Sequence, residues 1–348
     1  MNGKKKLQKS PYIIENCIDL CRGTLSALDS VLFKLKNNLK VIPNENGQIS
    51  NSSLDGNQYL VHGFAWIATY IESLKQMTNW AIALDEKSSF GEIENLILQI
   101  AFGEYLSQLK GGIQMSPSEF IRITDFGLSN GELEELNCKS ILNLCELGNT
   151  DDAKRTLVNF LKQNPMSPVF ANNGLEPEYE EIRNQFFRFS NEKVVPEAHN
   201  WHMQNLLIPT SLISELSKLG VFSLTIPEEF GGLGMSKTAM CVVSEELSRG
   251  YIGVGSLATR SEIAAELILT GGSKKQKEEW LPKIASAEIL PAAVFTEPNT
   301  GSDLGSLQTR AVLKGANYYV TGNKTWITHA SRANMMTLLA RTNQKSKN

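Results

Sequence analysis

The sequence predicts an α+β fold, in which mainly helical N-terminal regions are followed by the beginning of an antiparallel β domain. Apolar residues recur at the three- and four-residue spacing of amphipathic helices through most of residues 1–288. From residue 289 the chain changes to short runs rich in Val, Tyr and Thr, separated by turn residues. A Pro- and Asn-rich stretch at 164–178 divides the helical part. We therefore expect three domains, over 1–165, 175–288 and 289–348.

Composition narrows the class of protein. The 348 residues are enough for two or three domains. The formal net charge of -3 argues against a general nucleic-acid binder, because such proteins carry a basic excess. Five cysteines without a C-x-x-C pair predict buried thiols in a reducing compartment. The start of the chain lacks the apolar region of a signal peptide, and no run approaches the roughly 18 apolar residues of a membrane span. We expect a cytoplasmic protein without a membrane span.

The first 165 residues are expected to be helical. The polar stretch 37–58 contains Pro and Gly and is expected to be a loop. Asp55 is expected to cap the next helix, because a short side-chain oxygen can accept from the free N–H groups of a first turn. Ser116, Pro117 and Glu119 form a start signal with a capping box for another helix. The other helices of this part are expected over 11–39, 92–110, 132–148 and 150–165.

Two sets of histidines are considered as sites. His62, Trp66 and Tyr70 follow one another at four-residue spacing, and such a stripe is more typical of core packing than of a ligand site. His199 and His202 lie three residues apart on a helix, but a metal site needs a third ligand and the sequence offers none. We therefore expect no metal.

The chain from 179 to 288 is expected to be helical with one interruption. Residues 226–234, "IPEEFGGLG", lack the Walker lysine and the Rossmann spacing, so they are interpreted as a turn and not as a phosphate site. Ser236 is expected to cap the helix after this turn, and Ser273 with Gln276 forms a capping box. The helices are expected over 179–194, 208–220, 236–250, 256–272 and 274–285, and the strands over 289–295, within 309–328 and over 334–342.

Two short polar segments follow predicted strands. Residues 296–303, "TEPNTGSD", place hydroxyls and free N–H groups just after the strand that ends at Phe295. Residues 322–330, "GNKTWITHA", supply Trp326 with threonines on either side. Hydroxyls and N–H groups can bind ring heteroatoms and phosphate oxygens, and an indole face suits a planar ring. These residues alone indicate a cofactor or base-like ligand, and the alternative is an ordinary hairpin rim with Trp326 in the core.

The two segments resemble the signatures of a flavoprotein family, the acyl-CoA dehydrogenases. "FTEPNTGSDLGSLQTRA" is similar to the flavin-loop signature T-E-P-x-x-G-S-D, and "VTGNKTWITHA" is similar to the second signature, G-x-K-x-W-I-T. The similarity covers residues from about 178 to 341. It implies that 175–288 is the family's N-terminal helical domain and that 289–348 begins a β-barrel-like middle domain. It also implies FAD as cofactor and α,β-dehydrogenation of an acyl-CoA thioester, a reaction of fatty acid metabolism.

The resemblance implies roles for single residues. Trp326 would stack behind the isoalloxazine ring, Thr328 would hydrogen-bond near its N5, and Ser302 would also face the thioester substrate. The family's base is a glutamate in or beside a C-terminal helical bundle, so no catalytic residue is named, and Glu297 belongs to the loop signature. The residues implied to line the flavin and its pyrophosphate are Phe295, Thr296, Gly301, Ser302, Trp326 and Thr328.

The resemblance reaches only the N-terminal portion of the family pattern. The rest of the β domain and the C-terminal bundle are missing from this sequence, so we expect a truncated chain that is inactive alone and holds FAD weakly. For the complete form, the resemblance implies an acyl-CoA substrate, an electron-transfer acceptor protein and a homo-oligomer. Residues 1–165 lie outside the usual pattern and look like the N-terminal extension of a larger bacterial subgroup.

Three residues bear on the acyl group. Ile252 stands where members of the glutaryl-CoA type carry a carboxylate-binding arginine, and this disfavours a dicarboxylyl substrate. Arg260 and Glu262 share a predicted helix near the pocket floor, where they either approach the pocket or pair with each other at the surface.

Two other functions remain open at this point. The chain could be a non-catalytic helical interaction protein that retains a relic flavin half-site, or a flavin oxidase or monooxygenase of the same fold. A flavin spectrum of the full-length protein separates the interaction protein from both enzymes. Anaerobic bleaching of that flavin by acyl-CoA separates the dehydrogenase from the oxidase.

The proposed boundary makes a prediction for proteolysis. Limited digestion is expected to cut first between Asn164 and Glu178, because Pro and Asn crowd there and few contacts are expected. The first cut is mapped by mass spectrometry of the fragments. A first cut inside 60–110 contradicts an independent helical unit over 1–165.

Overall fold

A computed structural model describes residues 11–39, 51–163 and 171–343. The chain divides into two compact units, Met1–Gly174 and Leu175–Asn348, which are described separately. The basic first ten residues, residues 40–50 of the predicted loop at 37–58 and residues 164–170 of the Pro- and Asn-rich stretch lie outside the described residues. The proteolysis result therefore stays a prediction.

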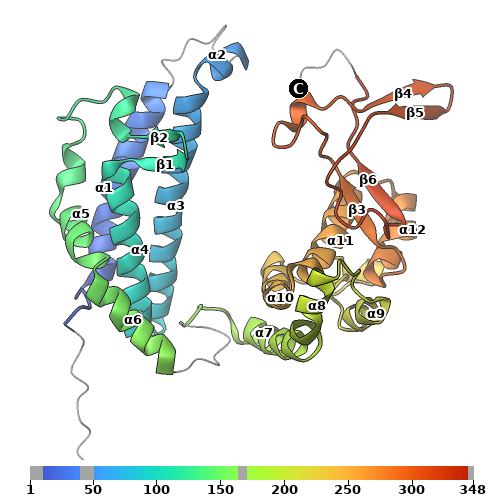
Figure 1. The fold of residues 1–348 in the computed structure, drawn as a ribbon, viewed down its shortest axis with the longest axis horizontal. Coiled ribbons are helices and arrows are strands. Elements are labelled where there is room, and N and C mark those ends of the chain that lie inside the picture. The colour runs from blue at the N-terminus through green and yellow to red at the C-terminus, as the bar shows by residue number, and fades with distance from the viewer. Residues whose placement is uncertain (1–10, 40–50, 164–170, 344–348) are drawn as a thin grey trace, which may run out of the picture. The chain divides into compact units, whose positions relative to one another are not determined.

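Three long helices, α1 (Cys17–Leu39), α3 (Gln58–Glu86) and α4 (Glu92–Gly111), run side by side in the first unit (Figure 1). The buried residues of α1 follow one another at three- or four-residue intervals from Cys17 to Leu35, which is the helical pattern read from the sequence. Leu28, Leu74 and Phe102, one from each helix, are fully buried in the shared core. The helix α6 (Asp151–Gln163) packs beside α4. The helices predicted over 92–110 and 150–165 are therefore confirmed.

Two start signals in this unit are wrong. Asp55 lies inside a short helix, α2 (Asn51–Gly56), and α3 begins after Asn57. Ser116 does not start a helix but ends β1 (Ile113–Ser116), which pairs with β2 (Glu119–Ile121) as an antiparallel hairpin. The reason lies in burial, because Ile113 and Ile121 are paired across the hairpin and both are buried in the core.

The predicted continuous helix over 132–148 is also wrong. This stretch holds the 3-10 turn η2 (Glu134–Asn137), the short helix α5 (Lys139–Asn143) and the π-helical turn η3 (Leu144–Gly148). Cys138 is extended between the first two, with ψ at 152°, and this interrupts the helix.

The stripe on α3 packs at the core margin. Trp66 and Tyr70 are partly buried there, and the tyrosine ring stacks on a neighbouring tyrosine with centroids 4.4 Å apart.

The second unit is helical up to residue 285. Ser236 accepts from the Ala239 N–H at 3.3 Å, and Ser273 forms a reciprocal capping box with Gln276, so both predicted caps are confirmed. The interruption at 226–234 is a turn around η5 (Glu228–Phe230), as predicted. The helices are α7 (Pro177–Phe189), α8 (Val195–Met203), α9 (Thr210–Lys218), α10 (Lys237–Gly250), α11 (Ile252–Gly271) and α12 (Lys274–Ala285), with the π-helical turn η4 (Ser190–Val194) joining α7 to α8.

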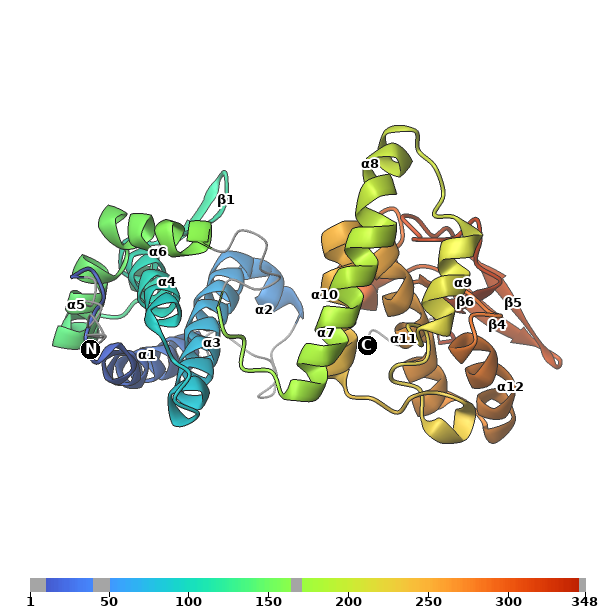
Figure 2. The same ribbon diagram turned by 90° about the horizontal axis from the view of Figure 1, so that it is seen from below.

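Two small sheets follow the helices (Figure 2). β3 (Pro291–Val294) pairs in parallel with β6 (Met335–Leu338). Between them, β4 (Arg310–Lys314) and β5 (Asn317–Thr321) form an antiparallel hairpin, whose turn contains Gly315 with φ at 64°. The predicted α+β class is confirmed, although one described sheet is parallel and neither closes into a barrel.

No helix in the described part of the chain is both long enough and apolar enough to cross a membrane.

Candidate functional site

The two polar segments lie against each other. The first leaves the end of β3 and the second leaves the end of β5. The Thr325 N–H donates to the Thr296 carbonyl at 3.0 Å, and the Lys324 ammonium donates to the Phe295 carbonyl at 2.7 Å. The end of one strand is thus joined to the segment that carries Trp326 and Thr328, although the two are far apart in sequence.

Glu297 anchors this junction. Its carboxylate accepts from the Gln308 N–H at 2.7 Å, the Thr309 N–H at 2.8 Å and the Lys324 ammonium at 3.0 Å. Glu297 is only 6% exposed. One buried carboxylate therefore connects the loop, the approach to β4 and the second segment. The lysine of the second motif was not singled out from the sequence, because its partner lies in the first motif.

The ionisation of Glu297 excludes it as a base. Burial by itself raises its pKa, but hydrogen bonds from Thr309 and from the backbone N–H groups of Gln308 and Thr309, together with the Lys324 ammonium, outweigh burial and lower the pKa to about 2. A carboxylate with so low a pKa is a poor proton acceptor near neutral pH. Glu297 is therefore a structural residue of the loop.

The cofactor residues implied by the motifs occupy an open surface. Phe295 and Thr296 are partly buried at the junction, whereas Gly301 and Ser302 lie on the exposed turn of the loop. Trp326 is 88% exposed, so the alternative of a core tryptophan is wrong. Residues 325–328 also form no strand, contrary to prediction.

The backbone explains how Trp326 is held outward. Its φ is 57°, in the left-handed region that bulky side chains seldom adopt. Strained positions of this kind persist where surrounding contacts fix them, and they gather at functional sites. The Thr325 N–H bond to the loop is one such contact. A broad indole face held in the open, with the exposed hydroxyls of Ser302 and Thr328 in the same two motifs, fits a planar cofactor with hydrogen-bonding edges.

Arg260 on α11 also reaches this segment. Its Nη2 donates to Thr328 Oγ1 at 3.2 Å. Glu262 instead forms an ion pair with Lys237 of α10, so the suggested pairing of Arg260 with Glu262 is wrong. The sequence spacing allowed this result, because residues two apart on a helix point to different sides.

Another basic residue follows closely. Arg332 donates to the Ile208 carbonyl. Burial and then the charge of Arg332 lower the pKa of His329, which favours the neutral imidazole. The Nε2 atom of His329 is buried without a hydrogen-bond partner.

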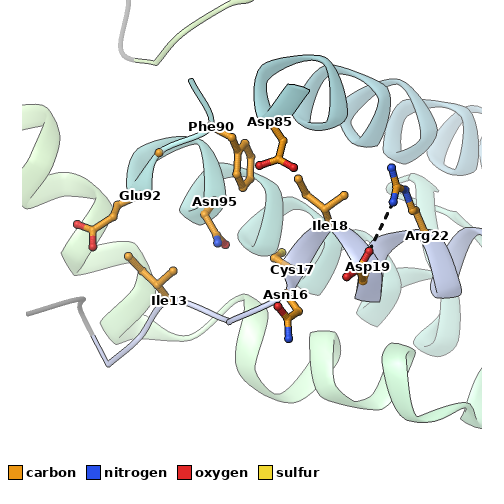
Figure 3. A pocket seen from close by; sticks show the side chains of 11 residues that line it. Ile13, Asn16, Cys17, Ile18, Asp19, Arg22, Asp85, Phe90, Glu92 and Asn95 are labelled. Atoms are coloured by element: carbon orange, nitrogen blue, oxygen red, sulfur yellow. Dashed lines mark ion pairs between the residues drawn. The ribbon is translucent and has the colours of Figure 1, made fainter. Parts of the chain in front are cut away.

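A separate hollow of about 410 Å³ lies in the first unit, where the start of α1 meets the start of α4 (Figure 3). Arg22 at its rim pairs with Asp19 at 3.5 Å. Burial raises the pKa of the nearby Cys21, which keeps its thiol protonated. Among the described residues, no three His, Cys, Asp or Glu side chains are grouped to hold a metal ion. The hollow is lined by Ile13, Asn16, Cys17, Ile18, Asp19, Arg22, Asp85, Phe90, Gly91, Glu92 and Asn95.

Two domain families match the second unit. The acyl-CoA dehydrogenase N-terminal domain matches residues 176–288, and the acyl-CoA dehydrogenase middle domain matches residues 292–348. The chain belongs to the acyl-CoA dehydrogenase family. The junction at Glu297 and the exposed Trp326 thus lie within the match to the family's middle domain.

Two named relatives and one solved structure are similar to parts of this chain. A (2S)-methylsuccinyl-CoA dehydrogenase from Cereibacter sphaeroides is 53% identical over 330 residues, which cover 95% of this chain and 60% of the relative. The mitochondrial isovaleryl-CoA dehydrogenase of Bos taurus is 34% identical over 185 residues, covering 52% of this chain and 43% of that protein. A crystal structure of glutaryl-CoA dehydrogenase from Mycobacterium smegmatis shares 33% identity over 49% of this chain and 44% of its own, with a TM-score of 0.46.

The coverage separates the two units. The 330-residue match takes in most of the first unit as well, whereas the two domain matches begin at residue 176. Helices α1 to α6 therefore lie in a region that the methylsuccinyl-CoA relative shares with this chain. The chain spans 60% of the length of that relative and less than half of the isovaleryl-CoA dehydrogenase.

Proposed function

We propose that this acyl-CoA dehydrogenase chain contributes one wall of an FAD site and that the whole protein dehydrogenates an acyl-CoA thioester of the methylsuccinyl type. The observation that carries the proposal is the junction of the two motif segments, in which Glu297 and Lys324 hold an exposed Trp326 beside the end of β3. The 53% identity to a methylsuccinyl-CoA dehydrogenase supports the choice of substrate.

The proposed roles follow from the chemistry of the side chains. The indole of Trp326 covers one face of the flavin ring, and the loop at Phe295, Thr296 and Gly301 lines it. Ser302 offers a hydroxyl to the pyrophosphate or the thioester. Bound FAD supplies the acceptor for the hydride that leaves the β-carbon.

Thr328 is suited to contact the N5 edge of the ring. Arg260 donates to its oxygen, which satisfies one acceptor position of the hydroxyl. The O–H of Thr328 is then directed away from the guanidinium and is available to donate to the cofactor. Because Glu297 has a pKa of about 2, the base that removes the α-proton is another group. We further propose that the electrons leave the protein to an acceptor protein.

The test uses full-length protein purified under mild conditions. We expect a flavin absorption spectrum that bleaches anaerobically when methylsuccinyl-CoA is added. Reoxidation by an artificial electron acceptor, with slow reoxidation by oxygen, identifies a dehydrogenase. Protein that neither contains nor binds FAD contradicts the proposal and favours an interaction protein, whereas rapid reoxidation by oxygen favours an oxidase.

Trp326→Ala is expected to weaken FAD binding in the full-length protein. Aromatic stacking contributes about 1 kcal/mol, which corresponds to roughly a fivefold higher dissociation constant. Trp326→Phe retains a ring and is expected to lose less. The measurement is a fluorescence titration of the apoprotein with FAD, together with the flavin-to-protein ratio after gel filtration.

The exposure of Trp326 makes this experiment decisive. A side chain that is 88% exposed contributes little to the folded core, so the melting temperature of the apoprotein should barely change. An unchanged FAD dissociation constant in Trp326→Ala contradicts the assignment.

A further inference from the structure

We propose that the hollow of about 410 Å³ in the first unit binds a short aliphatic diamine, with one ammonium group at Asp85 and the other at Glu92. The hollow lies between the start of α1, the end of α3 and the start of α4 (Figure 3). Its volume falls within the range of about 300–1,000 Å³ that is usual for small-ligand pockets. The inference goes beyond the proposed function and does not depend on the flavin site.

The charges that line the hollow favour a cation. Neither Asp85 nor Glu92 forms an ion pair or a side-chain hydrogen bond with another residue that the structure describes. The basic residue in the described lining is Arg22, and its guanidinium already pairs with Asp19 at 3.5 Å. The lining thus carries three carboxylates against one guanidinium, an excess of two negative charges. Two separate carboxylates are therefore available to two ammonium groups.

The helices themselves do not need these two carboxylates. Asp85 lies in the last turn of α3, where the helix dipole already places partial negative charge and no basic residue is present. An ammonium group bound there supplies the cation that this helix end lacks. Glu92 lies in the first turn of α4, but Glu94 is the residue that caps this helix, since its Oε2 accepts from the Gly91 N–H at 3.0 Å. The Glu92 carboxylate therefore remains available to a ligand.

The space between the carboxylates suits methylene groups. Figure 3 shows the Asp85 carboxylate to one side of the Phe90 ring and Glu92 on the other. Ile13 and Ile18, from the segment that enters α1 and from its first turn, line the same hollow, and both are partly buried. An alkyl chain can cover these apolar groups, and an ammonium beside an aromatic ring gains a cation–π contact. A metal ion fits less well, because no three His, Cys, Asp or Glu side chains are grouped for one among the described residues.

The lining also holds an acceptor that has no donor. Asn95 Nδ2 donates to the Ile14 carbonyl at 3.2 Å, and this bond leaves the Oδ1 atom of the amide as the free acceptor. Oδ1 is buried and accepts no hydrogen bond from a described residue. A buried acceptor without a donor is unfavourable, and an ammonium group carries donors only. The polar groups of the hollow therefore match a ligand whose ends are ammonium groups.

The experiment measures Kd by isothermal titration calorimetry on full-length protein. The ligands are putrescine, which has two ammonium groups, butylamine, which has one, and butanediol, which has none. The variants are Asp85→Asn, Glu92→Gln and the double variant. The matched control is Glu86→Gln, which removes an exposed carboxylate from the same turn of α3 but outside the lining of the hollow. The melting temperature of each variant shows whether it folds.

Wild-type protein is expected to bind putrescine about tenfold more tightly than butylamine, because the second ammonium makes a second charge-assisted contact. Butanediol should not bind. Asp85→Asn and Glu92→Gln should each weaken putrescine binding by about tenfold and change butylamine binding by only a few-fold, so that the preference for the diamine disappears. The double variant should lose saturable binding, and Glu86→Gln should match the wild type.

Other outcomes overturn the inference. Wild-type protein that shows no saturable binding of putrescine, or that binds butanediol equally well, has no diamine site. If Glu86→Gln weakens putrescine binding as much as Asp85→Asn does, the amine binds to general surface charge and not to the hollow. The three ligands on wild-type protein decide the proposal even where a variant fails to fold. A protein that binds putrescine but not FAD contradicts the proposed function alone.

Discussion

Glu297→Ala is expected to lower the free energy of unfolding of the second unit by about 3–5 kcal/mol. The substitution leaves Lys324 buried without its partner, and it strands the N–H groups of Gln308 and Thr309, which both donate to this carboxylate. A buried charge without a partner carries most of the cost, because its desolvation is no longer offset. The free energy of unfolding is measured by urea denaturation, with tryptophan fluorescence as the probe.

The matched controls are Lys324→Met and the double variant Glu297→Leu/Lys324→Met. The double variant removes both charges. It is therefore expected to lose less unfolding free energy than the sum of the losses measured for the two single variants. Losses that simply add would show that the two side chains stabilise the loop independently and would contradict the ion-pair account.

The Glu297 carboxylate makes a contribution to the unfolding free energy of the second unit that is lost at acid pH. The folded pKa of Glu297, about 2, lies below its ordinary value of 4.5. Its contribution is therefore fully present above about pH 4.5 and is lost as the pH falls toward 2, with a total of about 3 kcal/mol. Glu297→Gln should remove this part of the pH dependence. If the difference in unfolding free energy between wild type and Glu297→Gln stays constant from about pH 6 to about pH 3, the assignment is contradicted.

Gly255→Ala is expected to destabilise the second unit by about 1–3 kcal/mol. Gly255 lies where α11 crosses α10, and a Cβ there would come within 2.9 Å of the Ser244 carbonyl and of the Ser248 N–H nitrogen. Backbone atoms of a helix cannot rotate away, so the two helices must separate. Alanine gains helix propensity of about 1 kcal/mol over glycine, but steric separation of the helices costs more.

Gly271→Ala is the matched control on the same helix, because a Cβ at that position meets no atom within 4 Å. It should be neutral or slightly stabilising. If both alanine variants have the same stability, α10 and α11 do not pack as closely as described.

The sequence predicted those features whose causes are local. The caps at Ser236 and Ser273 depend on residues within one helical turn, so their side chains were sufficient to predict both helix starts. The prediction of a helix start at Ser116 was wrong because the same residue types occur at helix starts and in hairpin turns. What decided between them was the burial of Ile121 against Gly63 of α3, a contact that no local pattern contains.

The candidate site shows the same division. The two segments pointed to the residues around Phe295 and Trp326 because hydroxyls, free N–H groups and an indole face suit a planar ligand with hydrogen-bonding edges. The sequence did not predict the pairing of Glu297 with Lys324 or the bond from Arg260 to Thr328, since each joins residues far apart in the chain. It also placed Trp326 at a strand end, whereas its left-handed backbone turns it to solvent.

The parallel pairing of β3 with β6 turns the intervening chain into a ring. The two strands that close it are paired from Pro291 with Met335 to Val294 with Leu338, and both polar segments lie within the closed stretch. In polymer terms, the entropy of closing such a ring grows only with the logarithm of its length, by about 0.6 kcal/mol for each doubling. Residues added at the exposed hairpin turn around Gly315 therefore burden the ring little. The ion pair from Glu297 to Lys324 divides it into two smaller loops, so the segment with the proposed cofactor residues stays fixed while the hairpin can diverge in length and sequence.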